Sequence, residues 1–508
     1  MGHDATRGAG IRAALFLILA GPAGLAAQEA QRPATMSLSE AIELARRNNP
    51  DFRSTANDEW VSDWTAREAY GRFIPSVTVG TGFSYQASGT PRFGNFSSAD
   101  VGLSRTPEYF FSDYQIGMAL NLSGGTFFRA AQARANQGAT EARIEAAAYT
   151  LATNVTRQYL AALRSRDLVE IARSALESAE EAGRLADARA AAGGATRLDA
   201  AQAEVIRGRA EVALLQAENL ARTDRLRLLQ QIGVDLEQDI ELTSEFAVFE
   251  PAWTVEGLLE TAMGSHPGLR AARADEKAAT AGSRAAKTAY LPSIRISGGW
   301  TGFVRRTGSE QYLLDQARGS AESRIENCQF LNSIANGLNN PLPGYPEDCT
   351  KYQLTADQER AVLASNNLFP FHYEKNPFSA GIDISIPILD GFTRERQLQE
   401  ARVLADDAKH RRRAEELNRK AEVTANLLGL QTAYRSVQLE DRNASTAAEQ
   451  LYLSQERYRL GAGSILELTQ AQETKARADQ ARLAALYSFH ESLAALEAAV
   501  GVPLREQR

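Results

Sequence analysis

The stretch LSEAIELARRNNP, which ends at Pro50, decides the fold because the chain contains it in two versions. The second version is TVEGLLETAMGSHP, which ends at Pro267, 217 residues later. FIPSV, with Pro75, follows the first version, and YLPSI, with Pro292, follows the second at the same 217-residue offset. Internal similarity at a fixed offset indicates a structural unit that occurs twice.

A second pair of matching segments lies further along each half. GGATRLDAAQA begins at Gly193 and GAGSILELTQA begins at Gly461, 268 residues apart, so the second half has gained about 51 residues. The turn-forming residues and cysteines of residues 304–377 place this extra length in a long surface loop. We expect one repeat over residues 38–254 and another over residues 255–502.

Four segments alternate apolar and polar residues with period two, which is typical of strands. They cover residues 75–86, 114–123, 292–303 and 378–388. Each has about ten residues, enough for a tilted strand to cross a bilayer. The alternative is a soluble sheet packed on helices. Aromatic residues at the strand ends favour a membrane barrel, as do Asn121, Arg295 and Asp383 on the polar faces, which suit a wet lumen. If the last two strands form a hairpin, Arg295 and Asp383 lie near each other on the lumen face.

The remaining segments are rich in Ala, Leu, Glu, Arg and Gln, which predicts helices. A proline-free run of about 67 residues leads to each of the two glycine turns, and such a helix extends about 100 Å. The return segments are each broken in two, and their summed lengths match the long helices. We therefore predict helical hairpins over residues 125–233 and 391–501 that build one hollow column. An ordinary two-stranded coiled coil is the alternative for such helices.

The number of strands predicts the oligomeric state. Four strands cannot close into a barrel, and an open sheet edge is not tolerated in lipid. Two chains would give eight strands with a filled interior, whereas three chains give twelve strands and leave a passage. We expect a homotrimer that contacts membrane lipid.

The composition and the N-terminus indicate an exported protein. Arg7 and Arg12 precede an apolar run and a stretch of small residues, so we expect residues 1–27 to be a signal peptide. No cysteine follows the expected cleavage point, which predicts no lipid anchor. The two cysteines of the chain, Cys328 and Cys349, most simply close a loop disulfide. The formal charge of −7 is mild and interspersed, so we expect no nucleic-acid partner.

No catalytic or metal-binding constellation emerges from the sequence. The five histidines lack metal-ligand spacing, and the two cysteines lack the partner ligands of a zinc site. GSHPG at Gly264 carries a histidine where a nucleophile elbow requires serine. We expect neither an enzyme nor a bound metal or cofactor.

The paired openings, the IPS and LPS entries into strands, PILDGFTRERQLQEA and RYRLGAGSILELTQA together resemble the TolC-type outer-membrane efflux family. The resemblance implies a mostly α trimer with a twelve-stranded transmembrane β-barrel in the outer membrane of a diderm bacterium. Long helical hairpins would form an α-barrel across the periplasm, and residues 235–253 and 503–508 would form an equatorial region.

The implied function is a passive export duct of a tripartite efflux or type I secretion system. A periplasmic adaptor protein would connect it to an inner-membrane pump or ABC exporter. The alternative from another class is a trimeric periplasmic coiled-coil scaffold or adhesin without a conducting pore.

The resemblance also assigns roles at the two hairpin tips. The expected adaptor contacts are Gly193, Gly194, Thr196, Gly461, Gly463 and Ser464, although the same glycines also suit helix C-caps. The expected periplasmic gate comprises Glu467, Gln470, Tyr458, Asp199 and Gln202. Gln470 departs from the second acidic ring of the family, and Gly463 stands where some members place a basic partner. Three copies of Glu467 would favour cations, whereas its alternative is a solvated surface carboxylate.

Overall fold

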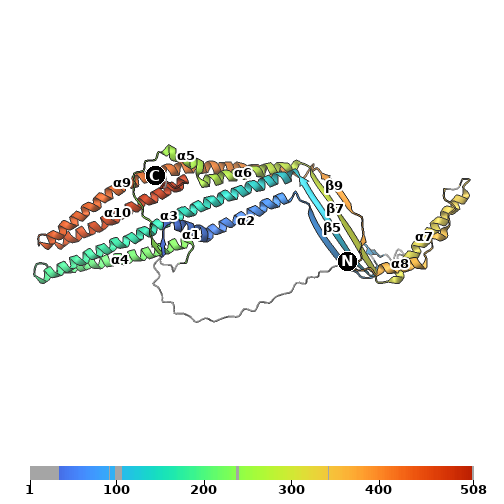
Figure 1. The fold of residues 1–508 in the computed structure, drawn as a ribbon, viewed down its shortest axis with the longest axis horizontal. Helices are drawn as coiled ribbons and strands as arrows, with labels where there is room; N and C mark the ends of the chain where they lie inside the picture. Colours follow the sequence, from blue (N-terminus) through green and yellow to red (C-terminus); the bar gives the residue numbers. More distant parts are fainter. Residues whose placement is uncertain (1–33, 91, 98–105, 236–239, 341–342, 506–508) are drawn as a thin grey trace, which may run out of the picture.

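The computed structural model describes residues 34–90, 92–97, 106–235, 240–340 and 343–505. The expected signal peptide, residues 1–27, lies outside the described residues, as do residues 236–239 and 506–508 of the expected equatorial region. The molecule is elongated, with long helices on one side, a sheet beyond them, and a helical arm past the sheet (Figure 1).

The two halves of the chain contain the same order of long elements. The first half has α1 (Leu38–Asn48), α2 (Pro50–Gly71), β2 (Ser76–Gln86), β5 (Tyr109–Ser123), α3 (Gly124–Ala191) and α4 (Arg197–Ile232). The second half has α5 (Val255–Ser265), α6 (Pro267–Lys287), β7 (Ser293–Thr307), β9 (Ser379–Ser385), α9 (Thr393–Arg459) and α10 (Ile465–Val500). Shorter strands are β1 (Ala34–Met36), β3 (Arg92–Phe93), β4 (Phe96–Ser97), β6 (Ile240–Leu242) and β8 (Glu374–Lys375).

The strands differ from the sequence-based bounds at their ends. β5 starts at Tyr109 rather than at residue 114, and β7 continues to Thr307 rather than ending at residue 303. The two extensions pair with each other, since Tyr109 lies opposite Thr307 in one continuous antiparallel ladder. β9 ends at Ser385, so residues 386–388 leave the strand. Pro387 explains this end, because proline has no N–H to donate to a ladder.

The prediction of a loop over residues 304–377 is wrong in part, because much of this segment is helical. It contains α7 (Glu310–Gly337) and α8 (Ala356–Asn366), and α7 forms the arm that stands beyond the sheet (Figure 1). Cys328 and Cys349 form a disulfide with an S–S distance of 2.00 Å. The side chain of Asn332 also accepts a hydrogen bond from the Glu347 N–H at 2.8 Å. These links hold the returning chain against α7.

Helix boundaries follow from capping residues. Ser37, Ser123, Thr196 and Ser464 are N-caps whose hydroxyls accept an N–H of the first turn. A break before a proline separates α1 from α2 at Asn49–Pro50 and α5 from α6 at His266–Pro267. The residue before proline is disfavoured in helical conformation, which ends α1 and α5 there. We call these two breaks the first joint and the second joint.

The long elements lie side by side in one row. The strand order is β2, β5, β7 and β9, all antiparallel. Near the sheet, α3 contacts α2 and α6, and α6 contacts α9; near the tips, α3 contacts α4 and α10, and α10 contacts α9. One edge of the row therefore consists of β2, α2 and α4, and the other edge of β9 and α9.

The apolar cores lie where the joints meet the long helices. One cluster joins α1, α3 and α4 around Tyr159 and Ile232, and a second joins α5, α9 and α10 around Leu427 and Phe489. Tyr159 is fully buried, and its hydroxyl donates to the Met36 carbonyl at 2.8 Å. Among the described residues, no helix combines the length and apolarity that crossing a membrane requires.

Candidate functional site

Each hairpin tip is a short turn closed by glycine and capped by a hydroxyl. Gly193 and Gly461 have φ of 73° and 79°, a region that glycine occupies without a Cβ clash. In the first tip the Gly194 N–H donates to the Arg189 carbonyl, and in the second the Ala462 N–H donates to the Arg457 carbonyl. The expected adaptor-contact residues therefore all lie in two turns with the same local construction.

The two tips meet through a small apolar cluster. Its buried members are Ala182, Ala186, Ala203, Tyr458, Ile465 and Leu468. Tyr458 is only 2% exposed, and burial raises the pKa of its hydroxyl. That hydroxyl has no hydrogen-bond partner within the described part of the chain. The expected gate tyrosine is thus packed inside its own chain.

Arg189, at the end of α3, connects the two tips. Its Nη1 donates to the Tyr458 carbonyl at 2.5 Å, and its Nη2 donates to the Gly194 carbonyl at 3.1 Å. The guanidinium carbon lies 4.5 Å from the centre of the Tyr458 ring. One side chain therefore holds a carbonyl of each tip and covers the ring.

The acidic residues expected at the gate have different surroundings. The Asp199 carboxylate accepts from the Thr196 N–H at 2.7 Å and from its hydroxyl, and these bonds lower the pKa of Asp199. Asp199 thus closes a capping box at the start of α4. Glu467 is not bound in this way: its carboxylate is about half exposed and lies 3.7 Å from Arg457 Nη2. The Glu467 side chain therefore takes no part in capping its helix.

The two expected gate glutamines line one groove. Gln202 of α4 and Gln470 of α10 face a space of about 520 Å³, together with Leu198 and Leu466. A larger groove of about 840 Å³ shares Arg209 and Glu473 with it and continues between α4 and α10 over α3.

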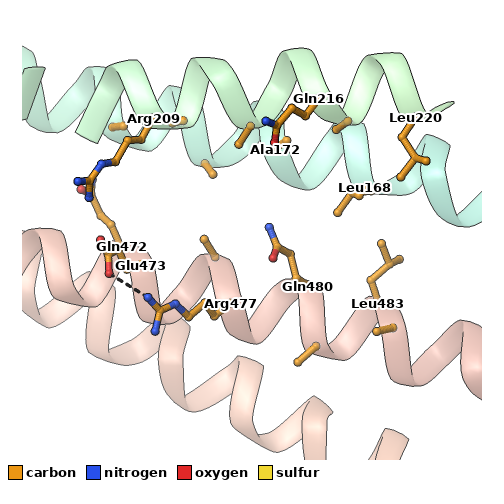
Figure 2. A pocket seen from close by; sticks show the side chains of 18 of the residues that line it. Leu168, Ala172, Arg209, Gln216, Leu220, Gln472, Glu473, Arg477, Gln480 and Leu483 are labelled. Atoms are coloured by element: carbon orange, nitrogen blue, oxygen red, sulfur yellow. Dashed lines mark hydrogen bonds and ion pairs between the residues drawn. The ribbon is translucent and has the colours of Figure 1, made fainter. Parts of the chain in front are cut away.

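Figure 2 shows this larger groove, whose walls carry short alanine side chains between a few polar ones. Glu473 and Arg477 form an ion pair at 3.3 Å along its edge. Gln472 donates to the Ser178 carbonyl at 2.8 Å, while its side-chain oxygen is buried without a hydrogen-bond partner within the described part of the chain. These side chains offer a polar surface along an open groove, without a nucleophile and base in contact.

On the sheet, the expected lumen residues form one row across three strands. The register sets Asn121 opposite Arg295 and Arg295 opposite Asp383. Asn121 and Arg295 line a polar groove of about 470 Å³. The expected proximity of Arg295 and Asp383 agrees with the register, but no ion pair joins them among the described residues. The alternate residues Val79, Ile382 and Ile384 are large, apolar and exposed.

Within the described ranges, no group of three or more His, Cys, Asp or Glu side chains is placed to hold a metal ion. The five histidines include two that are buried, His266 and His490. The His266 ring contacts the Ala498 carbonyl, and the His490 ring packs against Phe246.

A family model described as outer membrane efflux protein matches residues 41–234 and 352–502. The chain belongs to the outer membrane efflux protein family. This membership assigns it to the outer membrane and to efflux transport. The matched ranges include most of the first half and β9, α9 and α10 of the second half, and leave out α5, α6, β7, α7 and the disulfide.

Similar proteins include a curated relative and several solved channels. The chain is 24% identical over 269 residues to the pyoverdine export outer membrane protein OpmQ of Pseudomonas putida, covering 52% of this chain and 56% of the relative. The match thus spans little more than half of that relative's length. The outer-membrane channel OprN is 17% identical with a TM-score of 0.67, covering 91% of this chain and 89% of the other. The CmeC outer membrane channel of Campylobacter jejuni is 15% identical with a TM-score of 0.68, covering 91% and 85%. The solved structures support the fold, and these names describe channels and an export protein, not enzymes.

Sequence reasoning missed Arg189. A signal was present, because an arginine stands four residues before the turn glycine in both hairpins, at Arg189 and at Arg457. Both arginines bond a carbonyl of their own tip. The sequence gives no indication that only Arg189 also reaches across to the other tip.

Proposed function

We propose that the chain is one protomer of a homotrimeric, passive export duct that spans the outer membrane and extends into the periplasm. Three protomers close a twelve-stranded β-barrel and continue as a helical tunnel. An inner-membrane pump or ABC exporter drives transport through a periplasmic adaptor that meets the hairpin tips. The chain is a duplicated unit, in agreement with the repeated order of elements in its two halves.

The observation that carries this proposal is the pattern of exposed apolar side chains on the two edges of the row of helices. On α4, Leu198, Val205 and Val212 are exposed at seven-residue spacing, and Leu226 follows in the same frame after the polar Asn219; Leu198 and Val205 also line the groove toward α10. On α9, at the opposite edge, Leu439 and Leu453 are exposed in one seven-residue frame that has Thr446 between them, and the C-cap residue Leu460 continues it. Sustained seven-residue spacing is typical of helices that pack against another helix. Each edge therefore suits the opposite edge of a neighbouring copy.

The sheet supports the same arrangement. Its edge strands β2 and β9 have free ladder positions, which joining copies would pair. The exposed apolar residues of one face, such as Val79 and Ile384, suit lipid, whereas Arg295 and Asn121 on the other face suit water. A closed barrel with a wet interior accounts for both faces.

At the tips, three copies of Glu467, one from each protomer, would form a ring of carboxylates at the narrowest point of the tunnel. Gln470 and Gln202 extend this lining with uncharged polar groups, so the ring is singly acidic. Such a ring favours cations over anions of the same size.

Planar-bilayer recording of the purified protein tests the proposal. We expect discrete, cation-selective conductance steps, and a scaffold or adhesin would give none. Leu453→Glu places a charge in the apolar stripe of α9 and is expected to reduce the trimer fraction in detergent by tenfold or more. Leu453→Met, which keeps an apolar side chain of similar size, is the matched control and is expected to remain trimeric.

A further inference from the structure

Position 463 is glycine, and the two arginines that flank Tyr458 in the second tip, Arg457 and Arg459, both bond within their own hairpin. The guanidinium that contacts Tyr458 comes from the other hairpin of the same chain, as Arg189 of α3. It reaches the Tyr458 carbonyl at 2.5 Å and covers the Tyr458 ring at 4.5 Å. A Cβ built on Gly461 would lie 3.7 Å from Arg189 Nη2, so the guanidinium lies directly against the second turn.

The hydroxyl of Tyr458 takes no part in these contacts. It is buried within its own chain without a hydrogen-bond partner among the described residues. A neighbouring copy could not reach this oxygen without displacing the side chains that bury it. The ring and the main-chain carbonyl are therefore the parts of Tyr458 that are held.

We propose that Arg189 is the positioning residue that fixes the second hairpin tip against the first, and through it sets the position of Glu467. This inference rests on the proposed channel function. Arg189 holds Gly194 of the first tip and Tyr458 of the second with separate N–H groups of one planar fork. Tyr458 lies in the last turn of α9, and Glu467 lies in the first turn of α10, so movement of this tip moves the carboxylate.

The geometry distinguishes Arg189 from the equivalent arginine of the second hairpin. Arg457 donates to the Ala462 carbonyl of its own tip at 3.2 Å and approaches Glu467, both within the second hairpin. Its loss would loosen one turn but would break no link between hairpins. Of these two arginines, Arg189 is the one whose removal breaks hydrogen bonds that link the tips.

The test uses the full trimer in planar bilayers with Arg189→Gln, Arg189→Lys and the control Arg184→Gln. Arg184 lies on the same helix and is exposed, and its guanidinium lies 3.9 Å from the Glu180 carboxylate, one turn away on α3. We expect Arg189→Gln to raise the ratio of open to closed time about tenfold or more, the size that loss of a charge-assisted hydrogen bond gives. Arg189→Lys keeps one point charge but not the fork, and is expected to lie between Arg189→Gln and the unaltered protein. Arg184→Gln is expected to match the unaltered protein.

A second pair of variants separates the ring of Tyr458 from its hydroxyl. Tyr458→Leu removes the ring that Arg189 covers, and Tyr458→Phe removes only the oxygen. We expect Tyr458→Leu to raise the open time more than Tyr458→Phe does. The reverse order would show that the hydroxyl is the held group and would overturn the proposal.

Hydrogen exchange of residues 459–466 provides a readout that does not depend on conductance. Arg189→Gln is expected to accelerate exchange there at least tenfold, with the trimer intact by sedimentation. If the unaltered protein gives no conductance, the channel function fails. If it conducts but Arg189→Gln changes neither gating nor exchange, or if Arg184→Gln opens the channel equally, the role of Arg189 alone is refuted.

Discussion

The first and second joints solve the same structural problem with different chemistry. In the first joint, Asn49 accepts from the Phe52 N–H at 2.9 Å and donates to the Gln231 carbonyl at 2.8 Å. In the second joint, His266 Nδ1 faces the Leu269 N–H at 3.3 Å, and its Nε2 lies 3.1 Å from the Ala498 carbonyl. Each side chain caps one helix and ties it to the end of another. An amide and a neutral imidazole are therefore interchangeable here, except that only the imidazole can take up a proton.

The C-terminal glycines of α4 and α10 are the tightest points of the two joints. A Cβ on Gly233 would lie 2.6 Å from the Asn48 carbonyl oxygen, and a Cβ on Gly501 would lie 2.7 Å from the His266 Cα. Both glycines also have positive φ, 80° and 89°. We expect Gly233→Ala and Gly501→Ala each to lower the free energy of unfolding by more than about 2 kcal/mol, measured by circular dichroism on heating.

Gly138→Ala is the control for these two variants. Gly138 lies inside α3, and a Cβ built on it would have no contact within 4 Å in the described part of the chain, apart from its two chain neighbours and the backbone of its own helix. Alanine at this position is therefore expected to stabilise the helix by up to about 1 kcal/mol. If the variants at the joints behaved like this control, the close packing of the joints would be disproved. If only one of them did, the two joints would differ in packing as well as in capping.

Removal of the capping side chains should have the next largest effect. Asn49→Ala and His266→Ala each remove an N-cap and leave a partly buried carbonyl without its side-chain donor, a loss of about 1 to 3 kcal/mol. The measurement is local hydrogen exchange over residues 38–58 and 255–275. Thr254→Ala is the control, because Thr254 caps α5 through one exposed bond and is expected to cost about 1 kcal/mol or less. Equal costs at all three sites would mean that the ties to Gln231 and Ala498 contribute nothing.

The smallest expected effect is the acid sensitivity that distinguishes the joints. Burial, and then the charge of Arg419 on α9, lower the pKa of His266, while the hydrogen bond to the Ala498 carbonyl and then Glu415 and Glu422 of α9 partly oppose this shift. Tyr149 of α3 also packs against the ring. A group with a depressed pKa contributes stability that is complete above about pH 6.5, its unfolded value, and declines as the pH falls below it. The second joint should therefore loosen in acid while the first joint does not.

Local hydrogen exchange, corrected for the intrinsic effect of pH, measures this difference. His266→Asn is expected to abolish the acid response of residues 267–270, and Asn49→His to create one at residues 50–53. A local readout is needed because burial, and then Arg505, also lower the pKa of His490 to about 4. An unchanged acid response in His266→Asn would assign it to His490 instead.

Much of this fold follows from local sequence signals. The alternating residues around Val79 and Ile296 predicted strands. Pro50 and Pro267 could have marked the breaks between α1 and α2 and between α5 and α6, since the residue before a proline disfavours helix. The helical arm α7 was missed because the Asn-, Pro- and Gly-rich segment around Pro343 dominates the composition of its region and conceals the helix before it. Pro387 could have marked the early end of β9, since a missing N–H is a local property.

The tips were less predictable for a different reason. Asp199 was expected at the gate, although Thr196 and Asp199 have the spacing of a capping box that was visible in the sequence. Arg189 and Tyr458 are 269 residues apart, and nothing local to either residue indicates the other. Contacts between the hairpins depend on how α3 and α10 pack against each other. This packing cannot be derived from a single sequence.

The two edge strands of the sheet, each paired on one side, have a consequence for biogenesis. Within the described part of the chain, β2 pairs only with β5 and β9 pairs only with β7, so a newly exported chain presents two lines of unused backbone donors and acceptors. Such lines also attract unrelated chains. The monomer is thus the aggregation-prone species. The yield of assembled protein should depend on the rate of association with other copies relative to the rate of aggregation. Expression level and chaperones that bind the monomer would change this ratio.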